Sequence, residues 1–498
     1  MDCATMTRKI AAIFLLLALL PGAAALAAPL SDDSQACLDC HAQATPGIVA
    51  AWQASRHAQT TPAQAMKLGG LAAKLSASAP PPEALATSVG CAECHTANAD
   101  SHPDSFEHQG FQVHAVVSPA DCARCHPVES RQFQQNLMAH ARGNLVDNPL
   151  YMDLAAQVNG VQQVDGAAIA VTPAEPNDEA ESCIYCHGSA VRVVGQITRQ
   201  TDFGEMTFAK LDGWPNHGVG RLNPDGVKGS CAACHSRHRF SMAVARSAYS
   251  CAECHKGPDV PAFKVYEVSR HGALFFAQHK DWDMNKTPWE PGKDFSAPTC
   301  AVCHVSLLAD GEGNVIAQRS HAMNERIWLR LLGLIQSHPH PKSPQTSLIR
   351  NADGQPLATT LDGRPATAFL IDQAEQDKRR QTMRRVCLAC HGQQWVDGQL
   401  ARIDAVSQSA DAMVLAASKL VRRAWQDGLA QGPAQGGSPF DEYIERLWVE
   451  QWLMHANGAR FAAAMMGPDL GVFESGRWPM AKNIRQMQDW LIQRKGEK

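Results

Sequence analysis

The sequence predicts a mainly α fold in two parts: a body organised around a repeated cysteine motif, and a helical bundle towards the C-terminal end. Three observations support this prediction. A five-residue motif, Cys-x-x-Cys-His, occurs eight times, and its copies become sparse after residue 304. Apolar residues in the last third of the chain recur at helical intervals of three and four. Runs of Val, Ile and Tyr, which favour strands, are scarce, so no strand pattern competes.

The composition excludes two broad classes of protein. The chain has 498 residues, with 45 Lys and Arg against 49 Asp and Glu, and a formal net charge of −4. This balance provides no basic field for binding nucleic acid. A hydrophobic content of 45% with a mean hydropathy of −0.25 is typical of a soluble globular chain rather than a polytopic membrane protein.

The first residues predict a secretory signal peptide over residues 1–27. Arg8 and Lys9 precede an apolar run that ends before Pro21, and Ala25-Leu26-Ala27 is a small-x-small cleavage site. The apolar run is too short for a lasting membrane span, although an uncleaved anchor is the alternative. We therefore expect a soluble periplasmic protein, and cleavage would leave sixteen cysteines and a net charge of −5.

All cysteines after this leader lie in the repeated motif, which is the attachment signature of c-type haem. The copies are Cys37/Cys40/His41, Cys91/Cys94/His95, Cys122/Cys125/His126, Cys183/Cys186/His187, Cys231/Cys234/His235, Cys251/Cys254/His255, Cys300/Cys303/His304 and Cys387/Cys390/His391. The two thiols bond to the haem vinyl groups, and the adjoining His ligates the iron. Disulfides would not require these histidines, and zinc ribbons do not repeat this pattern eight times. The motifs predict eight covalent haems, at roughly 59 residues per haem, so the haems form much of the core.

Thirteen histidines remain outside the motifs, and seven electron-carrying haems would each need one as a second, distal ligand. The predicted distal ligands are His57, His108, His140, His238, His271, His321 and His455. Most of them precede a small residue on a segment that looks helical, where a haem face can come close. His108 is preferred over His114. A histidine without metal is the alternative for each, and Met is a rival ligand. His338 and His340 lie beside prolines, and we do not expect them to be ligands.

The chain divides into three predicted segments: the signal peptide at 1–27, a haem-rich body at 28–365 with haems 1–7, and a helical region at 366–498 with haem 8. A loop at 340–366 is rich in Pro, Gly, Asn and Asp. Helices are expected from about Thr367 into the eighth motif, and through the apolar repeat around Val414. A further helix is expected to start at Ser438-Pro439, with a hydroxyl cap followed by Pro.

The eight-motif layout resembles the octahaem hydroxylamine oxidoreductase family. Specific strings carry the resemblance: PNHGVGRLNPDG, CAACHSRHRFS and CAECHKGPD after Trp214, YEVSRHG from Tyr266, APTCAVCH at 297–304, and MHANGARFAAAMMGPD at 454–469. They are distributed over nearly all of the mature chain. The resemblance implies that the fourth haem is catalytic and that the others relay electrons.

The resemblance also implies the catalytic residues. His187 of the fourth motif would ligate its iron from below and leave an open site above. His217 matches the distal-pocket His of the family, and Asn216 stands where the oxidative enzymes often have Asp. A histidine at that place can deliver or accept protons. The alternatives for His217 are an eighth distal ligand or a loop histidine.

Two departures from the oxidative members concern tyrosines. Leu470 stands where those enzymes have a Tyr that cross-links to the catalytic haem of a neighbouring subunit, and Phe295 stands in place of a pocket Tyr. Members without the cross-linking Tyr are associated with reduction. We therefore predict a periplasmic enzyme that reduces nitrite or hydroxylamine towards ammonia. The alternatives are oxidation of hydroxylamine to nitric oxide or nitrite, and an electron-transfer cytochrome without catalysis.

The expected partners follow from this function. They are a small nitrogen compound as substrate and a redox partner such as a cytochrome or a quinol oxidoreductase, either periplasmic or membrane-bound. The resemblance implies a homotrimer, although the residue that would link the subunits is missing. Nucleic acid is not expected as a partner.

Overall fold

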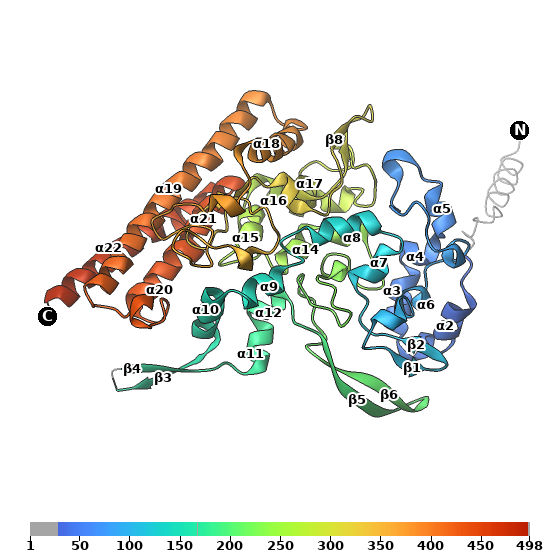
Figure 1. The fold of residues 1–498 in the computed structure, drawn as a ribbon. Helices are drawn as coiled ribbons and strands as arrows, with labels where there is room; N and C mark the ends of the chain where they lie inside the picture. The colour runs from blue at the N-terminus through green and yellow to red at the C-terminus, as the bar shows by residue number, and fades with distance from the viewer. Residues whose placement is uncertain (1–27, 167, 497–498) are drawn as a thin grey trace, which may run out of the picture.

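The computed structural model of the protein describes residues 28–166 and 168–496, so the expected signal peptide lies outside the described residues. In Figure 1, the N-terminal helices and the long C-terminal helices lie at opposite ends, with the remaining motif segments between them. The predicted mainly α fold is confirmed. No helix in the described ranges is long and apolar enough to cross a membrane.

Short helices build the body, and several begin with Pro in the first turn behind a side-chain cap, which satisfies the free N–H groups there. They are α2 (Asp32–Ala44), α3 (Pro46–Gln53), α4 (Arg56–Gln59), α5 (Pro62–Met66), α6 (Cys91–His95), α7 (Pro119–Ala123), α8 (Pro127–Gln134), α9 (Ala141–Val146), α10 (Pro149–Asn159), α11 (Pro176–Glu181), α12 (Cys183–His187), α13 (Met242–Arg246), α14 (Ala248–Ala252), α15 (Ala262–Glu267), α16 (Arg270–Gln278) and α17 (Cys300–His304). Short 3₁₀ turns are η1 (Gly70–Ala72), η2 (Pro82–Ala84), η3 (Ala99–Ser101), η4 (Cys231–Ala233), η5 (His279–Asp281), η6 (Met323–Arg326), η7 (Thr346–Leu348), η8 (Thr367–Phe369) and η9 (Pro433–Gln435).

Three of the motifs coincide with a complete short helix: α6, α12 and α17. Residues three and four apart share one face of a helix. Helical winding therefore turns the two thiols and the following histidine of each motif towards one side, as attachment of a single haem requires.

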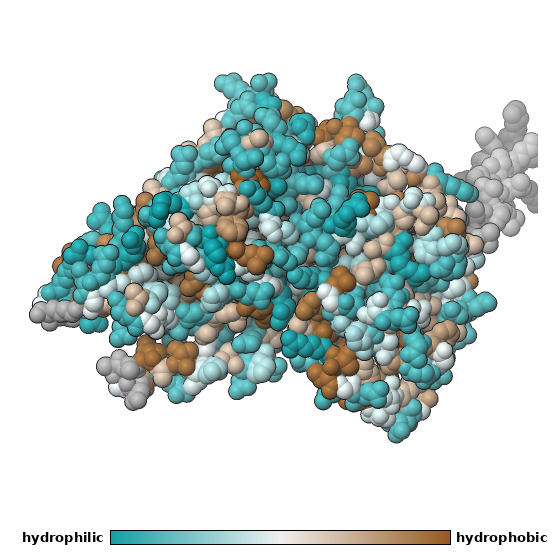
Figure 2. All heavy atoms as spheres, in the orientation of Figure 1, coloured by the Kyte–Doolittle hydropathy of each residue, from teal (hydrophilic) through white to brown (hydrophobic). Residues whose placement is uncertain are grey.

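The strands form two-stranded antiparallel hairpins, which the sequence analysis did not predict. They are β1 (Phe106–His108) with β2 (Phe111–Val113), β3 (Val161–Asp165) with β4 (Ala168–Thr172), β5 (Arg192–Thr201) with β6 (Gly204–Asp212), β7 (Leu308–Ala309) with β8 (Val315–Ala317), and β9 (Leu329–Arg330) with β10 (His338–Pro339). The β3–β4 and β5–β6 hairpins project from the body (Figure 1). Figure 2 shows hydrophobic patches on them, where Val164, Ile169, Val194 and Phe203 are exposed. Because β5 is exposed along almost all its length, it lacks the alternation of a half-buried strand.

The C-terminal helices pack around one hydrophobic core. They are α18 (Gln373–Leu388), α19 (Gln393–Gln426), α20 (Tyr443–Val449), the π-helical η10 (Glu450–His455), α21 (Ala456–Ala464), the π-helical η11 (Leu470–Glu474) and α22 (Arg477–Gly496). Val414 and Val421 of α19 share the core with Trp448, Trp452 and Met487, all nearly or completely buried. The apolar repeat in α19 therefore faces this core, as its helical spacing predicts.

The expected helix start at Ser438-Pro439 is wrong, because α20 is capped by Glu442 and begins at Tyr443, four residues later. Ser438 Oγ donates to Asp153 Oδ2 at 2.9 Å and accepts from the Phe440 N–H at 3.2 Å. The cap is instead Glu442, whose N–H donates to Glu445 Oε2 at 3.0 Å. A tertiary contact to α10 thus takes the hydroxyl that local capping rules assigned to the helix.

Candidate haem cavity and catalytic site

A cavity of about 1860 Å³ extends through the body, and all eight motif histidines line it. Every motif cysteine except Cys40 also lines it, and none of the motif cysteines forms a disulfide. The remaining lining residues are largely apolar. An apolar cavity that collects paired thiols and imidazoles fits covalently attached haems, since it provides the attachment groups, the iron ligands and a surface for the porphyrin.

Four predicted distal histidines lie opposite motif histidines. Two imidazole–metal bonds of about 2 Å each would place the ring centres on either side of a metal roughly 6 Å apart. The ring centres are 6.1 Å apart for His41 and His108, 6.3 Å for His126 and His57, 6.4 Å for His235 and His321, and 6.1 Å for His391 and His271. This spacing supports their assignment as ligand pairs of the first, third, fifth and eighth haems.

The second motif is approached by two other histidines. His238 lies close enough to His95 to affect it electrostatically. The ring centre of His114 is 6.2 Å from that of His95, but His114 Nε2 donates to Ala97 O at 2.9 Å. The His114 carbonyl also accepts from His95 Nδ1 at 2.8 Å. This bond orients the imidazole of His95 and leaves its Nε2 as the ligating nitrogen. The hydrogen bond from Nε2 engages the nitrogen that His114 would need for iron, and His238 remains the predicted distal ligand for a neighbouring haem.

Two predicted ligands, His140 and His455, are not among the residues that line the cavity. His140 Nε2 donates to Gln134 O at 2.8 Å, and His455 Nε2 lies 4.0 Å from Glu450 Oε2. Their assignment remains a prediction. His340, which the sequence analysis set aside, is 3% exposed and lines the cavity. Its Nδ1 donates to Pro341 O at 2.9 Å, so Nε2 carries the free lone pair.

The spatial order of the motifs differs from their order in the chain. Three pairs of sulfur atoms lie within hydrogen-bonding reach: Cys122 with Cys231, Cys186 with Cys254, and Cys251 with Cys300. Further cysteine neighbours are Cys37 with Cys91, Cys94 with Cys125, Cys254 with Cys234, and Cys303 with Cys387. The motifs therefore run first, second, third, fifth, sixth, seventh and eighth, and the fourth branches from the sixth.

The histidine of the fourth motif is oriented by a backbone carbonyl. His187 Nδ1 donates to Ala141 O at 2.8 Å, which leaves Nε2 as the ligating nitrogen. Burial is the main factor that lowers the pKa of His187, and the imidazole is therefore neutral, as an iron ligand must be. No ring contact pairs His187 with another histidine among the described residues.

Asn216 braces the loop that lies against the fourth motif. Its Oδ1 accepts from the Ser189 N–H at 3.2 Å and the Gly218 N–H at 2.9 Å, and its Nδ2 lies 3.4 Å from Ile184 O. These contacts engage Oδ1 twice and Nδ2 once with backbone groups, and they fix the position of the loop. A catalytic role for Asn216 remains a prediction.

His217 lies beside two arginines, and their effect on its pKa is larger than that of Glu253. Its Nδ1 accepts from Arg237 Nη2 at 2.9 Å. The guanidinium groups of Arg237 and Arg221 lie 4.6 and 5.1 Å from the centre of the Trp214 ring. Burial and then these two positive charges lower the pKa of His217, so the imidazole is neutral with its proton on Nε2. Sequence analysis missed Arg237, whose only signal was its place between two histidines in CHSRH.

Leu470 and Phe295, which stand in place of the two family tyrosines, are both buried. Leu470 is 5% exposed and packs with Val265 and Phe461 of its own chain. The correspondence of Leu470 with the linking Tyr remains a prediction. Phe295 is buried against Trp289, with ring centres 4.5 Å apart. Neither position provides a phenol. Tyr443, the tyrosine of the C-terminal helices, is exposed at the start of α20.

Comparison with known proteins agrees with the motif pattern. The family described as "Seven times multi-haem cytochrome CxxCH" matches residues 225–327, and the one described as "Cytochrome c554 and c-prime" matches residues 36–127. A probable nitrite reductase-hydroxylamine oxidoreductase fusion protein of Kuenenia stuttgartiensis is 23% identical over 435 residues, or 83% of this chain. The chain spans only 41% of the length of that curated relative.

Solved structures extend the comparison to the whole fold. A hypothetical multiheme protein is 37% identical, with a TM-score of 0.88 over 95% of this chain and 98% of its own. The Kuenenia stuttgartiensis reducing HAO-like protein complex Kustc0457/Kustc0458 is 19% identical, with a TM-score of 0.61 over 93% and 85%. The second likeness is one of fold.

Proposed function

Because the chain is a multihaem c-type cytochrome related to hydroxylamine oxidoreductase-like proteins, we propose that it is a periplasmic octahaem oxidoreductase that reduces nitrite and hydroxylamine towards ammonia. The reaction takes place at the fourth motif, and the other seven motifs hold the relay. Haem iron with an open axial position binds small nitrogen compounds and exchanges electrons with them. Side chains around His217 would attract the substrate by charge, donate a hydrogen bond to it and hold it in position.

Positive charge beside His217 is the observation that carries this proposal. Arg237 donates to the imidazole, and Arg221 lies on the same Trp214 ring. Two guanidinium groups attract an anion such as nitrite and repel a cation, and Arg matches the planar fork of two oxygens. In an oxidative site, a base that accepts protons would be expected at this place. The arginine that occupies His217 Nδ1 blocks that nitrogen from serving as the base.

His217 is assigned the role of hydrogen-bond donor to the substrate. With Nδ1 engaged by Arg237, the Nε2–H of the neutral imidazole can donate a hydrogen bond to a substrate oxygen, whereas transfer of that proton would leave an imidazolate. Asn216 holds the loop of His217 against the fourth motif through Ser189 and Ile184. This brace limits the distance that the imidazole can move, so the Nε2–H stays within hydrogen-bond reach of the substrate.

Electron supply follows the order of the motifs. Reduction of nitrite to ammonia takes six electrons, and the contact between Cys186 and Cys254 joins the fourth motif to the sixth. The sixth motif adjoins both the fifth and the seventh, so electrons can arrive from either arm of the relay. We assign their delivery to a periplasmic or membrane-bound redox partner.

Turnover in both directions tests the proposal. The purified holoprotein should form ammonia from nitrite and from hydroxylamine with reduced methyl viologen as donor. With ferricyanide as acceptor, it should oxidise hydroxylamine more slowly. Rapid oxidation without reduction would instead support the hydroxylamine-oxidising alternative. Absence of turnover in either direction, with every haem six-coordinate, would leave an electron-transfer cytochrome.

A further inference from the structure

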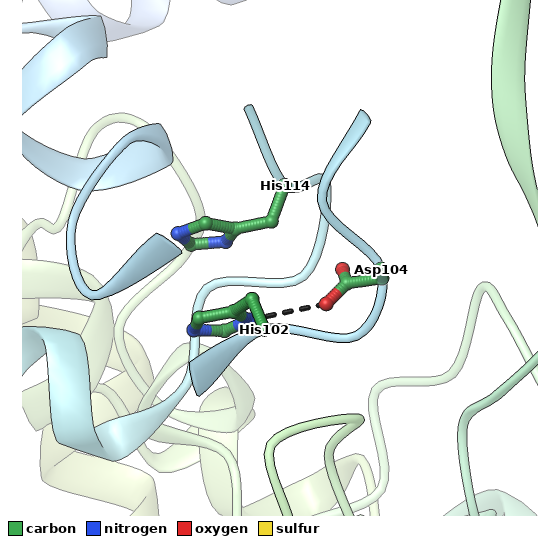
Figure 3. A group of neighbouring side chains, drawn as sticks. All are labelled: His102, Asp104 and His114. Atoms are coloured by element: carbon green, nitrogen blue, oxygen red, sulfur yellow. Dashed lines mark hydrogen bonds and ion pairs between the residues drawn. The ribbon is translucent and has the colours of Figure 1, made fainter. Parts of the chain in front are cut away.

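A buried group of His102, Asp104 and His114 lies outside the catalytic site. Its members are 4%, 0% and 1% exposed, and one ligand atom from each lies within 4.8 Å of the other two. The imidazole rings stack with centres 3.6 Å apart and planes 5° apart. Figure 3 shows the two rings one above the other with the Asp104 carboxylate beside them.

His114 presents a free lone pair to this group. Its Nε2 donates to Ala97 O at 2.9 Å, so the proton is on Nε2 and Nδ1 is an acceptor. Nδ1 is buried and has no hydrogen-bond partner. A buried polar atom without a partner is unfavourable, and an ion that binds it would remove that cost.

His102 has the outer contacts that metal-ligating histidines commonly make. Its Nδ1 lies 3.1 Å from Asp104 Oδ1, on the side that faces the group. Its Nε2 lies 3.3 Å from Asp121, which the Ser118 N–H and Asn98 Nδ2 hold in place at 2.8 and 2.9 Å. In both histidines, Nε2 is therefore hydrogen-bonded to a carboxylate or carbonyl oxygen and Nδ1 faces the group. Metal-ligating histidines commonly have one ring nitrogen engaged in this way.

The charge around His102 also favours a cation. Asp104, Asp121 and Asp225 lie 3.1, 3.3 and 3.9 Å from its ring nitrogens, and their side chains are at most 2% exposed. Three carboxylates thus gather around one imidazole, with Arg221 as a further positive charge near Asp225. Buried charges require compensation in a medium of low dielectric constant.

We propose that His102 Nδ1, His114 Nδ1 and an Asp104 oxygen bind a zinc ion, separate from the haems. Two imidazoles and one carboxylate are a zinc ligand set, whereas calcium and magnesium prefer oxygen ligands throughout. Each lone pair lies in the plane of its ring, so the bound ion tilts the stacked rings apart. The fourth position takes water.

The location indicates what the ion does. The His114 carbonyl accepts from Nδ1 of His95 in the second motif, and Asp121 directly precedes Cys122 of the third. Zinc here holds the segment between two haem motifs. It also places positive charge behind an iron ligand, which raises the reduction potential of that haem.

Metal analysis of the mature holoprotein from zinc-supplemented cells tests the proposal. We expect one zinc per chain in addition to haem iron. X-ray absorption at the zinc edge should show nitrogen and oxygen neighbours at about 2.0–2.2 Å with imidazole scattering and no sulfur. Protein without zinc would overturn the proposal, and so would sulfur neighbours, which indicate zinc on motif cysteines that lack haem.

A pair of variants locates the ion. His114→Gln should lower zinc affinity by roughly ten-fold or more while eight haems remain attached. The matched control is His279→Gln, because His279 bonds to Phe275 O away from the group and should keep the zinc. If His114→Gln does not fold, removal of zinc from the natural protein by dipicolinate should lower its Tm, and added zinc should restore it. Zinc retained in His114→Gln, or an unchanged Tm after removal, contradicts the proposal.

Discussion

Arg237 connects charge and proton placement at the candidate catalytic site. Its guanidinium stacks on Trp214 and donates to His217, so a single residue attracts an anion and determines which imidazole nitrogen carries the proton. Lysine would not reproduce both contacts, because its ammonium is a compact charge that lacks the planar fork. The residue therefore offers a test that separates substrates by their charge.

Replacement of Arg237 by Gln should lower kcat/KM for nitrite by roughly ten-fold or more, since charge in a cleft raises the capture of an anion. Hydroxylamine is mostly neutral at pH 7, so kcat/KM for hydroxylamine should fall less than kcat/KM for nitrite. Steady-state rates with both substrates measure the difference. Arg199→Gln, an exposed change on β5, is the control that should leave both rates unchanged. Equal losses for the two substrates would exclude anion capture as the role of Arg237.

Replacement of His217 by Ala should lower turnover by roughly 10²–10³-fold, the usual effect of removing one positioned hydrogen-bond donor to a developing negative charge. Haem content should not change, because His217 is not placed opposite a motif histidine. Electron paramagnetic resonance provides the second measurement. If the variant loses a low-spin signal, His217 is an iron ligand, and unchanged turnover would remove it from the mechanism.

At the scale of the element, Glu445 near the start of α20 should make the stability of the protein depend on pH. Burial is the main factor that raises the pKa of Glu445 to about 8, while its Oε1 accepts from Trp425 Nε1 at 2.6 Å. The folded protein thus retains a proton that the unfolded chain releases near its usual pKa of about 4.5. This contribution to stability is complete below pH 4.5 and is lost as the pH rises through 8.

Glu445→Gln should imitate the protonated side chain. Its Tm should equal that of the natural protein at pH 5 and exceed it at pH 8, where the natural side chain ionises in a buried place. Thermal unfolding at the two pH values measures this difference. An equal effect of the substitution at both values would show that Glu445 does not titrate in this range.

Two helical glycines should respond in opposite directions to alanine. On α21, a Cβ at Gly458 would lie 2.6 Å from Ser475 O, because the segment after η11 crosses there. On α19, a Cβ at Gly398 would meet nothing within 4 Å. Gly458→Ala should cost about 1–3 kcal/mol through overpacking. Gly398→Ala should stabilise by about 0.5–1 kcal/mol, since Gly is a poor helix former. Denaturant unfolding measures both, and a loss of stability in Gly398→Ala would refute the assigned environment.

At the scale of the whole molecule, the prediction concerns the number and spin state of the haems. Each motif provides two thiols and a ligand, so the denatured, reduced protein should contain eight covalent haems. Electron paramagnetic resonance should show one high-spin ferric centre, at the fourth motif, among low-spin centres. Fewer than eight haems from a host with full attachment machinery would mean that one motif is not used.

The His340→Ala variant tests whether His340 is one of the distal iron ligands that are not yet assigned. If His340 is a distal ligand, its removal should convert one low-spin signal to high spin, whereas His338→Ala, its buried neighbour outside the cavity lining, should not. If both variants keep every low-spin signal, His340 is not a distal ligand. The prediction of His140 and His455 as distal ligands then stands.

The sequence by itself determined what depends on neighbours along the chain. Attachment sites for haem need thiols and an imidazole within five residues, and one helical turn such as Cys183–His187 is enough to arrange them. The long helix α19 is also local, because its apolar repeat follows the helical period. Both features were predicted because the responsible contacts lie within a few residues.

The tertiary structure decided everything that depends on which segments meet. Arg237 donates to His217, which lies twenty residues earlier in the chain, and the Asn216 side chain accepts from a backbone N–H. Ser438 donates to Asp153 and does not cap α20. The order of the motifs, with the fourth beside the sixth, likewise has no trace in their spacing. The physical reason is that a side chain satisfies its hydrogen bonds and charge with whatever the fold brings nearest, and that partner lies in another part of the chain.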